Sequence, residues 1–213
     1  MKTKKLITSA MLIALATVLS VLQPFQLPFG GGITVASMMP IVIIAYVYGT
    51  RAGLFAGFVY SLLQLLLGAK TVAAFFLPGD SQMVLWQAVC VCLLDYIVAY
   101  TVLGFGGVFK GKIKSDAAAV CLGSVFALLL RYVTHIVSGA IFFGAWAEWF
   151  FTQEGFYAVG ETIMRTFSGA SLAWIYSVFY NGLYMLPEIA ITAIVTPVVY
   201  FALKRANLAN ADK

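Results

Sequence analysis

Ionisable and polar side chains interrupt a long apolar run in the second half of the chain. Arg131 and His135 are four residues apart, and Tyr132, His135 and Gly139 follow the spacing of one helical face. An ionisable side chain deep in an apolar helix is costly unless it faces a protein interior or a wet cavity, so these residues predict a functional site. The alternative is that His135 pairs with a neighbouring helix for packing alone, and this residue by itself leaves both interpretations open.

Two other apolar segments carry similar interruptions. Asp95 and Tyr96 fall near the middle of one segment, and Tyr176 and Asn181 open the last one. Asp95 would balance a cationic or NH-rich ligand, while His135 and Asn181 would provide directional hydrogen bonds.

Aromatic side chains accompany these polar groups. Phe143 and Trp146 follow His135, and tyrosines recur through the last segment. Aromatic faces stack on flat rings and attract cations. The combined chemistry predicts a pocket for a flat, nitrogenous, cationic small molecule.

The same residues argue against catalysis. The sequence has no evident pair of nucleophile and base with an oxyanion partner, and no set of two histidines with carboxylates that would bind a metal. Cys90, Cys92 and Cys121 all lie in apolar runs, which favours packing over a disulfide framework. We therefore expect no enzyme activity, catalytic residue, metal or cofactor.

The composition is that of an integral membrane protein. Of 213 residues, 62% are hydrophobic and 10% are charged, and the mean hydropathy is +0.98. An average soluble domain has about 25% charged residues. The length suits one transmembrane substrate-binding domain over residues 1–213, so the expected class is an all-α membrane protein in the bacterial plasma membrane.

The apolar segments predict a compact bundle of six transmembrane helices. The first follows three lysines and resembles a signal peptide, but further spans follow at once, so we interpret it as a transmembrane helix. Gln23–Gly32 and Gly68–Gln82 are expected to be loops, and Gly144–Ala173 a longer one with a short interfacial helix near Tyr157–Phe167. The six predicted helices are Leu6–Leu22, Ile33–Tyr48 with an interruption near Pro40, Ala52–Leu67, Met83–Leu103, Ala117–Phe143 and Trp174–Leu203.

Lysine and arginine residues predict the orientation, because they are enriched in cytoplasmic loops. With the N-terminus inside, two of them face outward, Lys70 and Arg165, and both termini are cytoplasmic. His135, Ser138, Tyr176 and Asn181 then fall in the outer half of their helices. The ten that face inward are Lys2, Lys4, Lys5, Arg51, Lys110, Lys112, Lys114, Lys204, Arg205 and Lys213.

Several stretches together resemble one known family. RYVTHIVSGAIFFG from Arg131 and YSVFYNGLYMLPE from Tyr176 are similar to the thiamine-specific substrate-binding (S) components of energy-coupling factor (ECF) transporters, the ThiT/YuaJ family. GGGITVASMMPI, RAGLFAGFVYSLLQLLLG and DYIVAYTVLGFGGVF precede them in the same order. The resemblance covers nearly the whole chain, and the combined pattern is far more specific than any single piece.

The resemblance implies a six-helix subunit that captures thiamine from outside. Transport would need a transmembrane coupling subunit and two cytoplasmic ATPases, and the family's proposed mechanism has the S component topple in the membrane. The first, alanine-rich helix would dock on the coupling subunit through Ala10 and Ala14. The implied ligand contacts are Asp95, Tyr96, His135, Gly139, Tyr176 and Asn181.

This chain departs from the family pattern at a few positions. Asp95 stands where the family usually has glutamate, so the carboxylate is one methylene shorter. A frequent tryptophan falls on Phe143, with Trp146 a turn later, and Arg131 replaces a residue that is often lysine. The segment Gly144–Ala173 is longer than usual.

These departures keep three alternatives open. An S component could bind a thiamine analogue, a precursor or another vitamin. A self-sufficient carrier could use Asp95 and His135 as a proton relay. The sequence lacks a clear internal repeat, which weakly disfavours many carrier folds.

Overall fold

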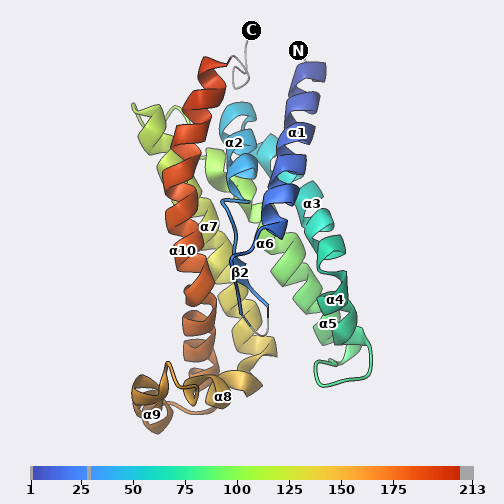
Figure 1. The fold of residues 1–213 in the computed structure, drawn as a ribbon, viewed down its shortest axis with the longest axis vertical. Coiled ribbons are helices and arrows are strands. Elements are labelled where there is room, and N and C mark those ends of the chain that lie inside the picture. The colour runs from blue at the N-terminus through green and yellow to red at the C-terminus, as the bar shows by residue number, and fades with distance from the viewer. Residues whose placement is uncertain (1, 28–29, 207–213) are drawn as a thin grey trace.

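The computed structural model describes residues 2–27 and 30–206, which form a helical bundle elongated along one axis (Figure 1). Met1, Pro28, Phe29, residues 207–213 and the side chain of Lys2 lie outside the described residues, so the charge prediction is untested at Lys2 and Lys213. Helix α1 begins and helix α10 ends at one end of the bundle, and α8 and α9 lie at the other.

Most of the predicted apolar helices are present. Among the described residues, five helical segments are long and apolar enough to cross a membrane. Helix α10 begins five residues earlier than predicted, and Pro187 and Pro197 both lie within it. The five segments are α1 (Lys2–Val21), α3 (Thr50–Leu67), the run from Leu85 to Gly107, α7 (Asp116–Phe142) and α10 (Gly169–Arg205).

The run from Leu85 to Gly107 changes its helical type along its length. Helix α5 (Leu85–Val91) leads into the π-helical segment η1 (Cys92–Val98), followed by α6 (Ala99–Thr101) and the 3-10 segment η2 (Val102–Gly107). π-Helical turns are rare and are frequent at functional sites. Asp95 and Tyr96 both belong to η1, where sequence periodicity predicted an ordinary α-helix.

The second predicted helix is much shorter than expected. Helix α2 is Met39–Tyr48, with Pro40 in its first turn, and the preceding residues back to Thr34 are not helical. Proline fits the first turn of a helix because the amide that it lacks has no partner there. Ten residues rise about 15 Å, roughly half of a hydrocarbon core. Every residue from Met39 to Val47 is buried, as expected of a helix that is apolar on all sides.

Some predicted loops contain secondary structure. Helix α4 (Ala69–Phe76) occupies much of the segment expected to be the Gly68–Gln82 loop. The loop after α1 contains an antiparallel bridge between β1 (Phe25–Gln26) and β2 (Gly32–Ile33). The segment after α7 forms η3 (Gly144–Trp146), α8 (Ala147–Phe151) and α9 (Tyr157–Thr166).

Glycines allow α3 to lie against its neighbours. A Cβ on Gly57 would fall 2.6 Å from the carbonyl oxygen of Tyr100, and one on Gly53 would collide with Ala45. Small residues permit this approach in lipid, where hydrophobic attraction between helices is weak. The close packing brings α3 against η2 and α2 and fixes one wall of the cavity described below.

Candidate functional site

A cavity of about 480 Å³ lies between α3, η1, α7, α10 and the segment that connects α1 to α2. Its volume is in the range of small-molecule sites. Tyr176 and Phe143 line it near the end of the bundle that carries α8. Arg131 and Glu188 line its deep end, twelve residues further along each helix, or about 18 Å.

Asp95 is held by two side chains of α7. His135 Nδ1 lies 2.9 Å from Asp95 Oδ1, and Ser138 Oγ donates to Asp95 Oδ2 at 2.7 Å. An ionised carboxylate only accepts hydrogen bonds, so Nδ1 carries the proton in this pair. His135 Nε2 is buried and has no hydrogen-bond partner among the described residues. That nitrogen is an acceptor when the imidazole is neutral.

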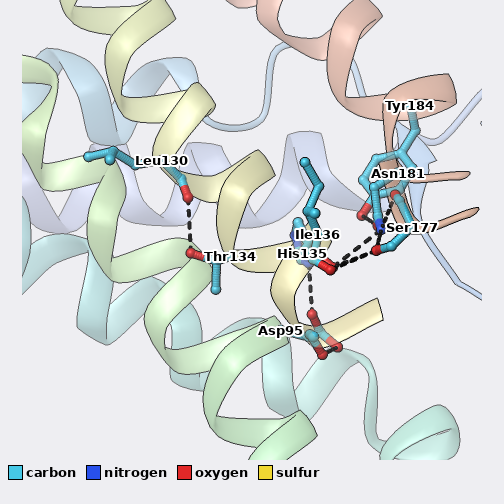
Figure 2. A network of polar contacts seen from close by, with 9 residues as sticks. Asp95, Leu130, Thr134, His135, Ile136, Ser177, Asn181 and Tyr184 are labelled. Carbon is cyan, nitrogen blue, oxygen red and sulfur yellow. Dashed lines mark hydrogen bonds and ion pairs between the residues drawn. The ribbon is translucent and has the colours of Figure 1, made fainter. Parts of the chain in front are cut away.

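Asn181 is the centre of a second network, on α10 (Figure 2). Its Nδ2 donates to the carbonyl oxygens of Ser177 at 2.9 Å and His135 at 3.3 Å, and Tyr184 Oη donates to its Oδ1 at 2.7 Å. These bonds fix the orientation of the side-chain amide. They also join the wall formed by α10 to the residue that holds Asp95.

Gly139 makes the contact between α7 and α10 possible at this level. A Cβ at this position would collide with Ser177 Oγ and lie 3.1 Å from Asn181 Nδ2. Ser177 Oγ donates to the carbonyl oxygen of Ile136 at 2.8 Å, so it has little room to move. Gly139 is therefore needed for the geometry of the network around Asn181.

Aromatic rings line the other end of the cavity. Phe143 lies edge-on to Phe75 of α4 with ring centroids 6.2 Å apart, and Tyr176 and Tyr180 are 5.5 Å apart. Such rings offer flat apolar faces with a polar rim. The cavity thus combines a carboxylate, directional hydrogen-bonding groups and surfaces for stacking.

The structure brings most of the sequence-predicted site residues to this cavity. Seven of the ten line it: Asp95, Tyr96, His135, Gly139, Phe143, Tyr176 and Asn181.

The other three predicted residues lie elsewhere. Ser138 is fully buried behind Asp95, to which it donates. Tyr132 Oη donates to the carbonyl oxygen of Val178 at 2.7 Å, and Tyr132 does not line the cavity. Trp146 lines a second cavity of about 290 Å³, which shares Phe75 and Phe143 with the first.

The predicted docking residues lie on the outside of the bundle. Ala10 and Ala14 of α1 are exposed, and Met11 and Val18 next to them are 68% and 62% exposed. Ser20 of the same helix is buried and accepts from Gln64 Nε2 at 2.8 Å. Helix α1 therefore has one face on the bundle and one apolar face without described neighbours.

The sequence analysis did not assign several residues of the cavity wall. Gln64 lines it from α3, Tyr184 and Glu188 line it from α10, and Arg131 lines it from α7. Glu188 and Arg131 carry the signal of a charged side chain inside an apolar helix, which alone could have identified them. Ser20, Gln23, Thr34 and Ser37 also line the cavity, but they come from the non-helical segment after α1 or its border, where no periodicity predicts a face.

The described residues offer no metal site, since no group of three or more His, Cys, Asp or Glu side chains gathers among them. Among those described residues that line the cavity, Asp95 and Glu188 are carboxylates and Arg131 is the one residue that is always cationic. With neutral His135, the formal charge of the wall is −1. That charge complements a monocation.

Comparison with known proteins gives the same direction. A family model described as "Thiamine transporter protein (Thia_YuaJ)" matches residues 6–152. The chain is 32% identical over 224 residues to the thiamine transporter ThiT of Bacillus subtilis strain 168, covering 98% of this chain and 95% of that protein. It is 24% identical over 171 residues to the thiamine transporter ThiT of Lacticaseibacillus paracasei strain ATCC 334, covering 76% and 70%.

A solved structure shares the fold. ThiT from Listeria monocytogenes superposes with a TM-score of 0.67 at 24% sequence identity, over 98% of both chains. Together with the apolar helices, these matches identify a multi-pass membrane protein that is a transporter rather than an enzyme. The chain belongs to the thiamine transporter protein (Thia_YuaJ) family.

Proposed function

We propose that this protein captures thiamine from the extracellular side of the bacterial plasma membrane. Thiamine joins a cationic thiazolium ring to a neutral aminopyrimidine ring, so it is flat, nitrogenous and monocationic. The observation that carries the proposal is the cavity wall, where Asp95 stands among His135, Asn181 and aromatic rings in a site of formal charge −1. The names of the relatives support the same ligand.

The proposed contacts are those that line the cavity. Asp95 would attract the cation, Tyr96, Phe143 and Tyr176 would pack on its rings, and His135 and Asn181 would make hydrogen bonds. Ser138 would orient Asp95 and Gly139 would leave room for Asn181. Tyr132 and Trp146 would act from outside the main cavity, one in packing and the other at the second cavity.

We propose a single domain over residues 1–213 that crosses the membrane six times, with both termini in the cytoplasm. The five long helical segments would supply five crossings, and α2 with the extended chain before it would supply the sixth. The turn at Arg51 and the lysines at 110, 112 and 114 lie at the end of the bundle where α1 begins, whereas Lys70 and Arg165 belong to α4 and α9 at the other end (Figure 1). This distribution supports a cytoplasmic position for the first end.

We further propose that transport requires a transmembrane coupling subunit and two cytoplasmic ATPases, as in ECF transporters. Helix α1 would dock on the coupling subunit through its small residues Ala10 and Ala14, because their exposed side chains let another helix approach closely. The apolar residues around them would face lipid or the partner.

A second candidate function is a carrier that works alone. The contact of His135 with Asp95 at 2.9 Å inside the bundle is the kind of pair that relays protons in transporters. The same site would then bind the ligand and exchange a proton.

Two measurements separate these candidates. Titration of the detergent-purified chain with thiamine, followed by tryptophan fluorescence with riboflavin and biotin as controls, tests the ligand. Saturable and selective quenching supports thiamine binding, and a flat response that calorimetry repeats contradicts it. Reconstitution of the chain alone in liposomes with a proton gradient tests the mechanism, because uptake would support the carrier and its absence would support dependence on partners.

A further inference from the structure

The deep end of the cavity contains two charged side chains that the proposed thiamine contacts do not use. Arg131 of α7 and Glu188 of α10 both line the cavity, with 8% and 1% of their surfaces exposed. They do not form an ion pair with each other, since the described ion pairs join other residues. We call Arg131 and Glu188 the deep pair.

Glu188 has one oxygen in use and one free. Its Oε1 accepts from the backbone amide of Thr34, at the end of β2, and its Oε2 is buried without a hydrogen-bond partner among the described residues. A buried carboxylate oxygen without a donor is costly, and such groups in native proteins call for an explanation. An N–H donor on a bound ligand would satisfy it.

Arg131 presents the complementary group. Its guanidinium lies over the ring of Tyr100, with Cζ 4.3 Å from the ring centroid, and its Nη1 donates to Met38 Sδ. Its Nε is buried and finds no acceptor in the described part of the chain. The stacking on Tyr100 fixes the plane of the guanidinium, so the direction of the Nε–H bond is also fixed.

The two ends of the cavity differ in charge. The Asp95 end has a carboxylate with a histidine that is neutral or positive, whereas the deep pair has one negative and one positive group and no formal net charge. A cationic ring is favoured at Asp95. A neutral ring that carries a donor next to an acceptor is favoured at the deep pair.

We propose that the deep pair is a specificity site for the aminopyrimidine ring of the ligand. Glu188 Oε2 accepts from the amino group, and Arg131 Nε donates to the adjacent ring nitrogen. The thiazolium ring then lies toward Asp95 and the aromatic end. This inference rests on the proposed thiamine ligand and adds which end of that ligand enters first.

The test compares thiamine with its analogue in which a ring carbonyl oxygen replaces the amino group. Glu188→Gln keeps the shape of the side chain and an oxygen for the Thr34 amide, but it places an NH₂ group where Oε2 accepts. We expect this variant to lose thiamine affinity by about tenfold or more while affinity for the carbonyl analogue is kept or increased. The ratio of the two dissociation constants therefore falls at least about tenfold.

A matched control is Glu148→Gln, the same change at an exposed carboxylate of α8 outside both cavities. It should leave the ratio unchanged. Equal losses for both ligands in Glu188→Gln would overturn the inference, because they would mean that Glu188 only supports the Thr34 segment. An unchanged ratio with unchanged affinities would overturn it too. If wild-type protein binds neither ligand, the proposed function itself fails, which this design distinguishes.

Arg131 is tested through its own ligand atom. Arg131→Lys keeps the positive charge and removes the Nε donor. We expect a several-fold loss of affinity for thiamine, about the effect of one hydrogen bond. The loss should vanish for an analogue with C–H in place of the ring nitrogen beside the amino group. A similar loss for both ligands would contradict the assignment of this contact.

Discussion

His135 Nδ1 lies 2.9 Å from Asp95 Oδ1, across the space between α7 and the π-helical segment η1. The contact orients the carboxylate from one side, and Ser138 orients it from the other. A carboxylate held by two donors in a largely buried site is prepared for a cation, because little reorganisation is needed when the ligand enters. This arrangement leads to the first expectation.

Asp95→Asn should weaken thiamine binding by about ten- to a hundredfold, since a hydrogen bond or contact to a charged group contributes roughly 1.5–3 kcal/mol. The amide keeps the size of the side chain, so the fold should persist. Calorimetric titration of the purified variant measures the effect, and its thermal unfolding checks the fold. Unchanged affinity would remove Asp95 from the site.

Asn181→Ala should weaken binding by a similar factor, because it removes the side-chain amide and leaves Tyr184 Oη without its acceptor. Helix α10 should remain intact, since alanine is a strong helix former. The same titration measures the loss. A matched control is Ile194→Ala, at a position of α10 that is 71% exposed and outside the cavity, and it should bind as the wild type does.

Ala10→Trp and Ala14→Trp should abolish transport in cells that contain the coupling subunit and ATPases, while the purified variants still bind thiamine. Both side chains are exposed on α1, so bulk there blocks a partner helix without disturbing the cavity. Uptake of labelled thiamine and binding in detergent give the two readouts. Ile194→Trp controls for bulk at a lipid-facing position. Lost binding in the α1 variants would instead assign this face to the fold.

Asp116→Ala should lower stability without changing affinity. Asp116 accepts from Tyr46 Oη at 2.9 Å and from Lys204 Nζ at 2.7 Å, which joins α2, α7 and α10 far from the cavity. Losing these bonds should cost roughly 1–2 kcal/mol, since Lys204 is solvent-exposed and Tyr46 is not. Thermal unfolding in detergent should show a lower midpoint, and thiamine titration should show the wild-type dissociation constant. A changed dissociation constant would mean that this cluster is coupled to the site.

Periodicity and apolar length predicted the long helices because those features are local. They failed at α2, where Pro40 fits the first turn of a helix as well as it fits an interruption, and at η1, because a π-helical turn leaves no pattern in the sequence. Polar residues in apolar helices identified Asp95, His135 and Asn181. The same rule applies to Glu188, but its contact with Thr34 joins residues far apart in the chain, and only the fold brings them together.

The central claim is that the cavity lined by Asp95, His135 and Asn181 binds thiamine. The most direct measurement is isothermal titration calorimetry of the wild-type chain in detergent, with Asp95→Asn in parallel and riboflavin as the unrelated ligand. We expect one thiamine bound per chain, a much weaker isotherm for the variant and no heat with riboflavin. Absence of binding by the wild type, or equal binding of thiamine by wild type and Asp95→Asn, would contradict the account.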